Sequence, residues 1–362
     1  MNVVTYGRCG AWGRATACLT LWLACGCGSV VNAEPLPDGG RRDVQGDGPR
    51  ATDAAHSDGG CDSGDPGVKC LAVADSTHLN GAITVDEKNV YWAASGQTPR
   101  DDVVMSVPRA GGAAVTLAHG SANALVSDGV SLYWTDWSAG LPATTGTIQR
   151  VPVAGGPVTR VATANSPNCI AVDETRVYWS EVMTGGLVAV ATEGGTPTTL
   201  AHAMAGLVAA PVVLDATNIY WAPASLMKVS KSGGSATPVW EDVPANTIAV
   251  VACRALAVVG ATLVFNYEIG QGPALIGTIP VTGAANPTVI VSAADPAYLV
   301  TSATNVFWVG HTSANDIDEM PLQGGSPVTL STPPDPQIND IVLASDGTLY
   351  WTGDFQIQSL KP

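Results

Sequence analysis

Charged residues are scarce in this sequence. Asp, Glu, Lys and Arg make up 13% of its 362 residues, about half the share that is usual in a soluble domain. Basic residues are scarcer than acidic ones, with 16 against 31. A nucleic-acid partner is therefore not expected, because phosphate binding needs a basic surface. There are only 3 Phe and few of the long side chains that favour helices, which argues against a helical bundle.

Motifs of common enzymes and cofactor sites are missing too. No Gly-x-Gly-x-x-Gly or Walker pattern is present to hold phosphate groups. There is no Gly-x-Ser-x-Gly nucleophile turn and no His-Glu-x-x-His helix. Cys-x-x-Cys does not occur, and no His stands at ligand spacing, so zinc is disfavoured. We therefore expect no cofactor, no resident metal and no catalytic residue.

Turn-forming residues are abundant instead, with 40 Gly and 25 Pro. They show no Gly-X-Y period, which excludes collagen, and a hydrophobic content of 46% is too high for wholesale disorder. Many turn formers in a chain rich in Val and Ala predict an all-β fold of short strands.

The first 24 residues have the features of an export signal. Arg8 and Arg14 give it a positive start, and the apolar stretch Ala15–Ala24 is too short to span a bilayer. An apolar stretch that ends in a small residue before Cys resembles the lipobox of bacterial lipoproteins. The resemblance implies acylation of Cys25, which follows the apolar run directly, or of Cys27. An ordinary signal peptide with incidental cysteines is the alternative.

Residues 25–66 follow as the acylated cysteine and a tether. The segment is rich in Gly, Asp and Pro and has no hydrophobic period, so it cannot offset the entropy of ordering. We expect an exported protein that is held to the bacterial cell envelope, at the outer membrane, only by its lipid anchor.

Four cysteines lie beyond the signal junction, an even number in an exported chain. Cys61 and Cys70 bracket a short Gly/Asp/Pro loop, which favours a local disulfide. Cys169 and Cys253 either pair or remain buried thiols.

Residues 67–362 consist of one repeated unit. A motif of one hydrophobic and two aromatic residues recurs seven times at 42 to 45 residues, with a degenerate fifth copy. The seven copies are Val90-Tyr91-Trp92, Leu132-Tyr133-Trp134, Val177-Tyr178-Trp179, Ile219-Tyr220-Trp221, Val264-Phe265-Asn266, Val306-Phe307-Trp308 and Leu349-Tyr350-Trp351. An Asp often stands six residues before the last motif position, and a glycine pair about twenty after it. Four short strands per copy, repeated seven times, predict a seven-bladed β-propeller.

The chain ends support closure of this ring. The last copy stops after its third strand, and residues 67–72 supply the missing fourth strand from the N-terminal side. Such a closing strand removes the open edge of the last blade.

One copy carries a more specific pattern. Leu132-Tyr133-Trp134-Thr135-Asp136-Trp137, followed by Ile148-Gln149-Arg150 and Gly155, resembles the YWTD repeat of low-density-lipoprotein-receptor class B propellers. That family is six-bladed and binds protein ligands, whereas this chain counts to seven blades. With its lipobox and tether, the chain looks more like secreted bacterial lipoprotein propellers.

The two faces of such a propeller differ. Short Asp and Gly-Gly turns fall on one face, called here the turn face, and variable loops fall on the other, the loop face, where function is expected. The Tyr-Trp pairs are expected in the core between blades, and the recurring Asp as a turn cap. We predict a shallow ligand site at the loop-face mouth of the channel. Its residues are Asn80, Asn123, Asn168, Arg254, Asn339 and Asp340, flanked by Asp136, Trp137 and Glu268.

The favoured function is a non-enzymatic envelope lipoprotein, a monomer, that binds a protein or glycan through its loop face. The alternative is a metal-dependent lactonase or lyase with its site at the channel mouth, where oxygen ligands would hold a divalent cation. Lactonase-like and streptogramin-lyase-like propellers place metal ligands or a catalytic His in the channel. His119 and His202 end fourth strands at the outer edge, which makes them poor candidates for that role.

Overall fold

The computed structural model describes residues 65, 67–73, 79–98, 100–136, 145–202, 210–223, 225–240, 247–249, 255–269, 273–284, 286–292, 296–310, 315–333, 337–354 and 356–362. All of them belong to one compact unit, Asp58–Pro362. The predicted signal segment, both candidate lipidation cysteines and Cys61 lie outside the described residues. Within the described part of the chain, no helix is long and apolar enough to cross a membrane.

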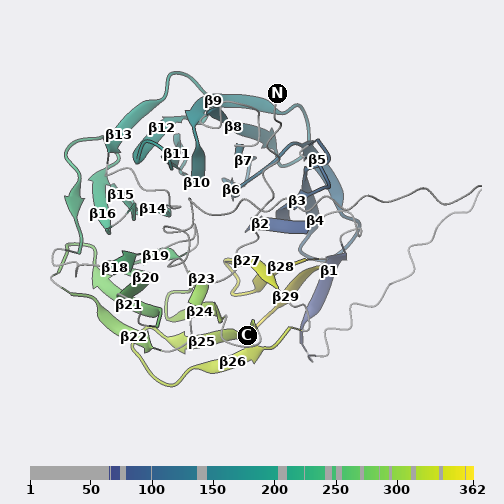
Figure 1. Ribbon diagram of the computed structural model, residues 1–362. Helices are drawn as coiled ribbons and strands as arrows, with labels where there is room; N and C mark the ends of the chain where they lie inside the picture. Colours follow the sequence, from purple (N-terminus) through teal and green to yellow (C-terminus); the bar gives the residue numbers. More distant parts are fainter. Residues whose placement is uncertain are drawn as a thin grey trace, which may run out of the picture. The chain divides into compact units, whose positions relative to one another are not determined.

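Seven antiparallel sheets make up this unit, and they stand around a ring as blades (Figure 1). Each of the first four blades has four strands in sequence order from the centre outward. Blade 1 comprises β2 (Leu79–Val85), β3 (Asn89–Ser95), β4 (Val103–Pro108) and β5 (Val115–His119). Blade 2 comprises β6 (Ala124–Ser127), β7 (Ser131–Asp136), β8 (Thr145–Pro152) and β9 (Thr159–Asn165). Blade 3 comprises β10 (Pro167–Val172), β11 (Arg176–Glu181), β12 (Gly186–Ala191) and β13 (Thr198–His202). Blade 4 comprises β14 (Val212–Leu214), β15 (Asn218–Trp221), β16 (Met227–Ser230) and β17 (Thr237–Pro238).

The last three blades depart from this pattern in two places. Blade 5 comprises β18 (Thr247–Ala249), β19 (Leu256–Val259), β20 (Thr262–Ile269), β21 (Leu275–Pro280) and β22 (Thr288–Ser292), and both β18 and β19 pair with β20. Blade 6 comprises β23 (Pro296–Thr301), β24 (Asn305–Gly310), β25 (Ile317–Pro321) and β26 (Val328–Ser331). Blade 7 comprises β27 (Ile338–Leu343), β28 (Leu349–Gly353), β29 (Gln356–Leu360) and β1 (Lys69–Val73). The predicted seven-bladed β-propeller is thereby confirmed.

The first strand of the structure closes the ring. Strand β1 pairs antiparallel with β29 and becomes the outermost strand of blade 7, next to blade 1 in Figure 1. The predicted closing strand is thus confirmed.

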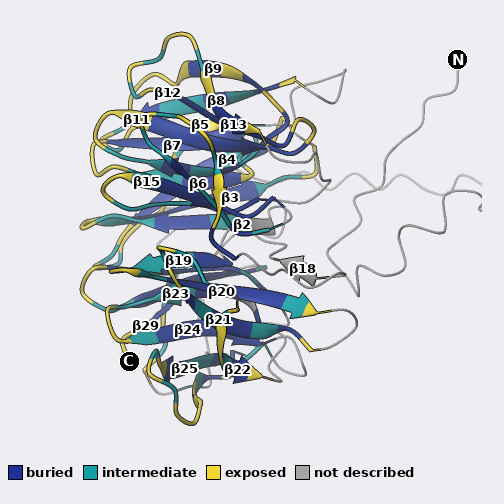
Figure 2. Ribbon diagram, turned by 90° about the vertical axis from the view of Figure 1, so that its left-hand side faces the viewer, coloured by how far each residue is buried: buried dark blue, intermediate teal, exposed yellow. Residues whose placement is uncertain are grey.

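The core lies between neighbouring blades. Second-strand aromatic rings are buried there: Tyr133 and Trp179, from adjacent blades, share one cluster, and Tyr178 and Trp221 share the next. Successive side chains of a strand point to opposite sides of its sheet, so each motif contributes to both interfaces of its blade. Figure 2 shows most of the inner strands buried, and the turns and parts of the outermost strands, such as β9, exposed. The prediction that these rings form inter-blade core is confirmed.

The strand pairing in blade 5 shows that the alignment of its repeat must be shifted by one residue. Leu256 on the inner strand pairs with Phe265, as Leu125 pairs with Trp134 and Ile170 with Trp179 in other blades. The fifth copy of the motif is therefore Leu263-Val264-Phe265, and Phe265 occupies the position of the recurring Trp. The sequence comparison placed Asn266 at the Trp position because it aligned Phe265 with the Tyr of the other copies. Strand pairing shows that Phe265 is aligned with the Trp instead. A further ring, Trp240 from the end of blade 4, packs edge-on to Tyr267 at 5.1 Å and fills this interface.

The recurring Asp caps the turn between the first two strands, as predicted, and it also bonds the Tyr of the motif. In blade 3, Asp173 Oδ1 accepts the amides of Thr175 and Arg176 at 2.9 Å each, and Oδ2 accepts the Tyr178 hydroxyl at 2.9 Å. The same arrangement recurs in blades 1, 2 and 4. Blade 6 has Ser302 and Phe307 instead, so Asp and the Tyr hydroxyl are lost together.

Candidate functional site

The inner strands are irregular at their loop-face ends. Bulges interrupt the pairing of four of them, between Asn80 and Ile83, Pro167 and Ile170, Pro296 and Leu299, and Ile338 and Asp340. In blade 5, residues 250–255 separate β18 from β19, which pair with the same strand. Bulges leave backbone groups outside the ladder and redirect side chains. The same bulge thus recurs at the loop-face mouth in blades 1, 3, 6 and 7, and blade 5 replaces it with a longer interruption.

Polar side chains of the second strands bond this irregular backbone. Thr135 Oγ1 donates to the carbonyl of Asn168 at 2.7 Å, and Thr352 Oγ1 donates to that of Gly81 at 2.8 Å. Asn266 Nδ2 donates to the carbonyl of Pro296 at 2.7 Å. In each case the acceptor lies on the inner strand of the next blade. Asn266 lies inside β20 and has this bridging role.

Asp340 is the predicted site residue with the clearest environment. Its side chain is buried, Oδ2 accepts the amide of Ile83 from blade 1 at 3.1 Å, and Oδ1 accepts the amide of Ile341 at 2.9 Å. Burial, and secondarily the charge of Asp340, raises the pKa of Tyr298 on the neighbouring blade to about 12. Asp340 thus joins the first and last blades.

A cavity of about 360 Å³ occupies the channel. Asn123 and Asp340 both line it, together with Ala82, Thr84, Val126 and other small or aliphatic side chains of the inner strands. These two are the predicted site residues that the structure brings to the channel wall.

The other predicted residues are placed differently. Asn339 Nδ2 donates to Asp354 Oδ1 at 3.2 Å, which joins β27 to the end of β28. Asn168 lies in β10, Asp136 ends β7, and Glu268 lies within β20 rather than in a loop. The Asn80 side chain, Trp137 and Arg254 lie outside what the structure describes.

Two buried carboxylates that the sequence did not single out hold the loop-face loops. Asp102 Oδ1 accepts the amide of Gly96 at 2.9 Å, and its other oxygen accepts the Ser121 hydroxyl. Glu181 accepts the amide of Asn165 at 2.9 Å and the hydroxyl of Thr184 at 2.8 Å. Each borders a variable loop, Asp102 just before β4 and Glu181 at the end of β11, and nothing in the sequence pattern indicated that either would be buried. Their bonds fix the backbone of the loops they border.

Left-handed backbone at non-glycine residues also falls on this face. Ser166 has a φ of 47° and Asn315 a φ of 51°, in a region that side chains other than Gly rarely adopt. Ser166 is fully buried, and its carbonyl accepts the amide of Val182 at 3.1 Å. Strained backbone held in this way is concentrated at binding and active sites in proteins.

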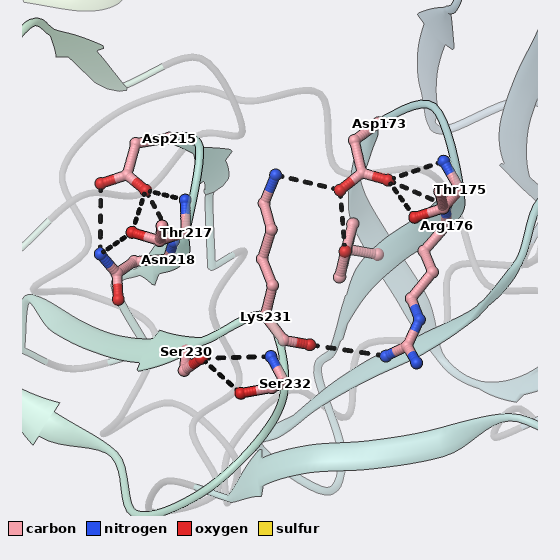
Figure 3. A network of polar contacts seen from close by, with 10 residues as sticks. Asp173, Thr175, Arg176, Asp215, Thr217, Asn218, Ser230, Lys231 and Ser232 are labelled. Atoms are coloured by element: carbon pink, nitrogen blue, oxygen red, sulfur yellow. Dashed lines mark hydrogen bonds and ion pairs between the residues drawn. The ribbon is translucent and has the colours of Figure 1, made fainter.

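The turn face, by contrast, is held by repeated structural bonds (Figure 3). Lys231 Nζ from blade 4 lies 3.0 Å from Asp173 Oδ2 of blade 3. Burial alone would raise the pKa of Asp173, but the Thr175 amide, Lys231 and Tyr178 outweigh it and lower that pKa. Burial and the Asp173 hydrogen bond raise the pKa of Tyr178. These charged groups are engaged in holding blades together.

The described charges of the loop face are mostly acidic. The carboxylates at this end of the blades are Asp101, Asp102, Asp136, Glu181, Glu268, Asp316, Asp340 and Asp354. The described basic side chain there is Arg100. In the described residues, no three His, Cys, Asp or Glu side chains gather as a metal-ligand set. His119 and His202 are exposed at the ends of the outermost strands, as expected.

The cysteines of the described region are oxidised. Cys70 in the closing strand and Cys169 in β10 are both disulfide-bonded, which removes the free-thiol alternative for Cys169. Their expected partners, Cys61 and Cys253, lie outside the described residues, so the two pairings stay predictions.

Comparison with known proteins identifies the fold but no family. No protein-family model matches the sequence, and no curated protein matches it. Virginiamycin B lyase from Staphylococcus aureus, in a catalytically inactive form with quinupristin, is 14% identical; the match covers 82% of this chain and 99% of that chain, with a TM-score of 0.64. The chain shares the seven-bladed β-propeller fold of its structural neighbours.

Neighbours of different character have similar scores. The extracellular domain of a protein described as a one component system from B. thetaiotaomicron is 10% identical over 82% of this chain and 40% of that chain, with a TM-score of 0.60. A chain of a mitotic checkpoint complex is 11% identical over 87% of this chain and 98% of that chain, with a TM-score of 0.56. At such identities the similarity establishes architecture, while function depends on the site.

Proposed function

We propose that this protein is an exported, lipid-anchored envelope protein whose propeller binds a protein or glycan ligand through its loop face. The observation that supports this most is the contrast between the two faces. The turn face repeats Gly-Gly turns and, in blades 1 to 4, the same Asp turns, whereas the loop face has connections between second and third strands that differ in length from blade to blade, two of them fixed by Asp102 and Glu181. A surface of fixed loops that differ between blades is the kind that a specific ligand requires.

Charge favours a protein partner with a basic surface. The described loop-face carboxylates outnumber the single described cation, Arg100. Opposite charges across an interface speed association and exclude wrong partners, and this contribution weakens with salt. Neighbours with this fold also include a chain of a protein complex, the mitotic checkpoint complex, and a sensor-type extracellular domain.

The test is affinity capture from envelope extracts with the full chain and two matched charge reversals. Asp101→Lys changes an exposed loop-face carboxylate, and Glu174→Lys changes an exposed turn-face one. We expect Asp101→Lys to reduce recovery of the specific partner several-fold and Glu174→Lys to leave it unchanged. Equal recovery of every partner by both variants would contradict the loop-face site.

A metal-dependent lactonase or lyase is the second candidate. The fold similarity to virginiamycin B lyase and the channel cavity with Asp340 in its wall support it. Elemental analysis of the purified full chain separates the two. A divalent metal at one equivalent per chain, lost on Asp340→Asn, would favour the enzyme.

A further inference from the structure

The turn face is hollowed on one side. Residues of the turns in blades 5, 6 and 7 surround an open hollow of about 470 Å³. Blades 1 to 4 have a capping Asp directly after the inner strand, whereas blade 5 has Val259 and the turn Gly260-Ala261, blade 6 has Ser302, and blade 7 has Ala344 and Ser345 before its own turn Asp, Asp346. The small residues of these turns leave space beside them, which forms the hollow.

This hollow adjoins the channel cavity. Val258, Thr301 and Leu343 line both the hollow and the channel cavity of about 360 Å³. Each of them is half-buried, near the turn-face end of an inner strand. Among the described residues, only these half-buried side chains therefore lie between the turn-face hollow and the channel cavity, on the side opposite to the loop-face site proposed above.

The channel wall is built from one strand position. Residues paired with the middle residue of the second-strand motif line the cavity in six blades: Thr84, Val126, Val213, Ala257, Val300 and Val342. All are small or β-branched and uncharged. Since these residues face the same cavity, the middle of the channel presents an aliphatic ring.

The described wall is poorly suited to a charged ligand. Of the described residues that line the two cavities, only Asp340 has an ionisable side chain. Its two oxygens accept the backbone amides of Ile83 and Ile341. Moving a charge from water into such a site is unfavourable without a counter-charge, whereas an apolar body gains from burial. Hydroxyls of Thr301, Ser302 and Ser345 at the mouth suit an uncharged polar group.

We propose that the channel is a second binding site, for a neutral ligand with an apolar body, which enters from the turn face between blades 5 and 7. The apolar body lies against the aliphatic ring. Its uncharged polar group lies among the hydroxyls of the mouth. The site includes the channel cavity that Asn123 and Asp340 line, but its entrance is on the face opposite to the loop-face surface, and it does not depend on the partner binding proposed there.

The experiment uses a neutral fluorescent probe, N-phenyl-1-naphthylamine, whose emission rises in apolar surroundings, titrated into the full chain. We expect saturable binding of one probe per chain. The anionic relative 1-anilinonaphthalene-8-sulfonate has the same ring system and should bind roughly tenfold more weakly, a difference of about 1.4 kcal/mol. Equal affinity for the two probes would overturn the proposal.

Two variants locate the site. Ala303→Trp adds a ring at the exposed mouth of the hollow, where it does not disturb the core. It should weaken binding of the neutral probe about tenfold or more. Val130→Trp adds the same ring to the corresponding turn of blade 2, at a residue that is 72% exposed, and should leave binding unchanged. Unchanged binding in Ala303→Trp would contradict entry at this mouth.

A third variant examines the channel itself. Ala257→Leu fills the aliphatic ring from blade 5, and should also reduce the affinity for the neutral probe. If this variant fails to fold, Ala303→Trp still decides the question, since its substitution is on an exposed turn. Capture of a loop-face partner by Ala303→Trp should equal that by the native chain, which separates failure of this proposal from failure of the function proposed above.

Discussion

Arg109 of blade 1 bonds Tyr350 of blade 7 across the seam where the ring closes. Its Nε donates to the Tyr350 hydroxyl at 3.0 Å, and its guanidinium carbon lies 5.6 Å from the centre of that ring. The same guanidinium lies 2.6 Å from Asp346. Tyr350 is thus bonded by an Arg from the next blade, whereas in blades 1 to 4 the Tyr is bonded by the Asp of its own turn. A cation of the next blade also lies on a turn Asp between blades 3 and 4, where Lys231 contacts Asp173, but at the seam the cation bonds the Tyr hydroxyl as well.

Removing that bond should weaken closure of the ring. Arg109→Gln loses the cation with its bonds to Tyr350, Asp346 and the carbonyl of Glu87, and should lower the free energy of unfolding by about 1.5–3 kcal/mol, the range for hydrogen bonds to charged groups. The measurement is urea denaturation of the full chain, followed by tryptophan fluorescence. Arg160→Gln, which changes an exposed Arg in blade 2, is the control and should cost less than about 0.5 kcal/mol. Equal losses in the two variants would show that the seam contact contributes nothing.

The corrected register of blade 5 makes its own prediction. Phe265 is fully buried at the position of the recurring Trp, so Phe265→Ala should cost about 3–5 kcal/mol of unfolding free energy. Asn266→Ala should cost about 1–3 kcal/mol, because it leaves the buried carbonyl of Pro296 without its 2.7 Å bond. Denaturation midpoints of the two variants test this order. A larger loss for Asn266→Ala would support the alignment read from the sequence.

The carboxylate of Asp340 should be replaceable by an amide but not by a methyl group. Asp340→Asn keeps an oxygen that accepts the Ile83 amide, whereas Asp340→Ala leaves that buried amide unpaired. We expect Asp340→Ala to cost about 1–3 kcal/mol more than Asp340→Asn in denaturant unfolding. Similar stabilities of the two variants would contradict the conclusion that this side chain acts by bonding the Ile83 amide of the next blade.

Acid should destabilise the propeller through its turn caps. Burial would raise the pKa of Asp215, but hydrogen bonds from Tyr220, Asn218 and Thr217 outweigh it and lower the pKa from 3.8 to about 2. A depressed carboxyl pKa stabilises the fold above the unfolded value, and this stability is lost as pH falls from about 4 to 2. Asp215→Asn should therefore be less stable than the native chain at pH 6, with the difference narrowing toward pH 2.

Thermal unfolding at several pH values measures that narrowing. Glu174→Gln, at an exposed position of the preceding blade's turn, is the control and should follow the native curve. A constant difference between Asp215→Asn and the native chain from pH 6 to pH 2 would contradict the assigned role of the cap.

The lipid anchor makes a prediction independent of the propeller. Cys25→Ser should abolish labelling by a fatty-acid analogue and release the protein from the membrane fraction, if Cys25 is the acylated residue. Cys27→Ser is the matched variant two residues away, and it should keep the label. Labelling that survives in both variants would contradict lipidation at this junction.

Much of this protein is determined by its sequence alone. A motif of paired aromatic residues repeating at 42 to 45 residues specifies a unit that cannot bury its aromatic rings by itself, so seven units pack as blades. Asp173 illustrates why local features were also predictable. Its role as a turn cap depends on amides two and three residues away, which sequence distance shows directly.

Tertiary structure decided what depends on contact between blades or on strand pairing. Phe265, rather than Asn266, takes the Trp position because Leu256 pairs with it. Arg109 reaches Tyr350 because closure brings the first and last blades together, although 241 residues separate the two. The channel ring and the hollow beside Ser302 likewise arise from residues of several blades, each unremarkable in its own repeat. A repeat specifies how each blade folds, but only the closed ring brings the side chains of separate blades together around one cavity.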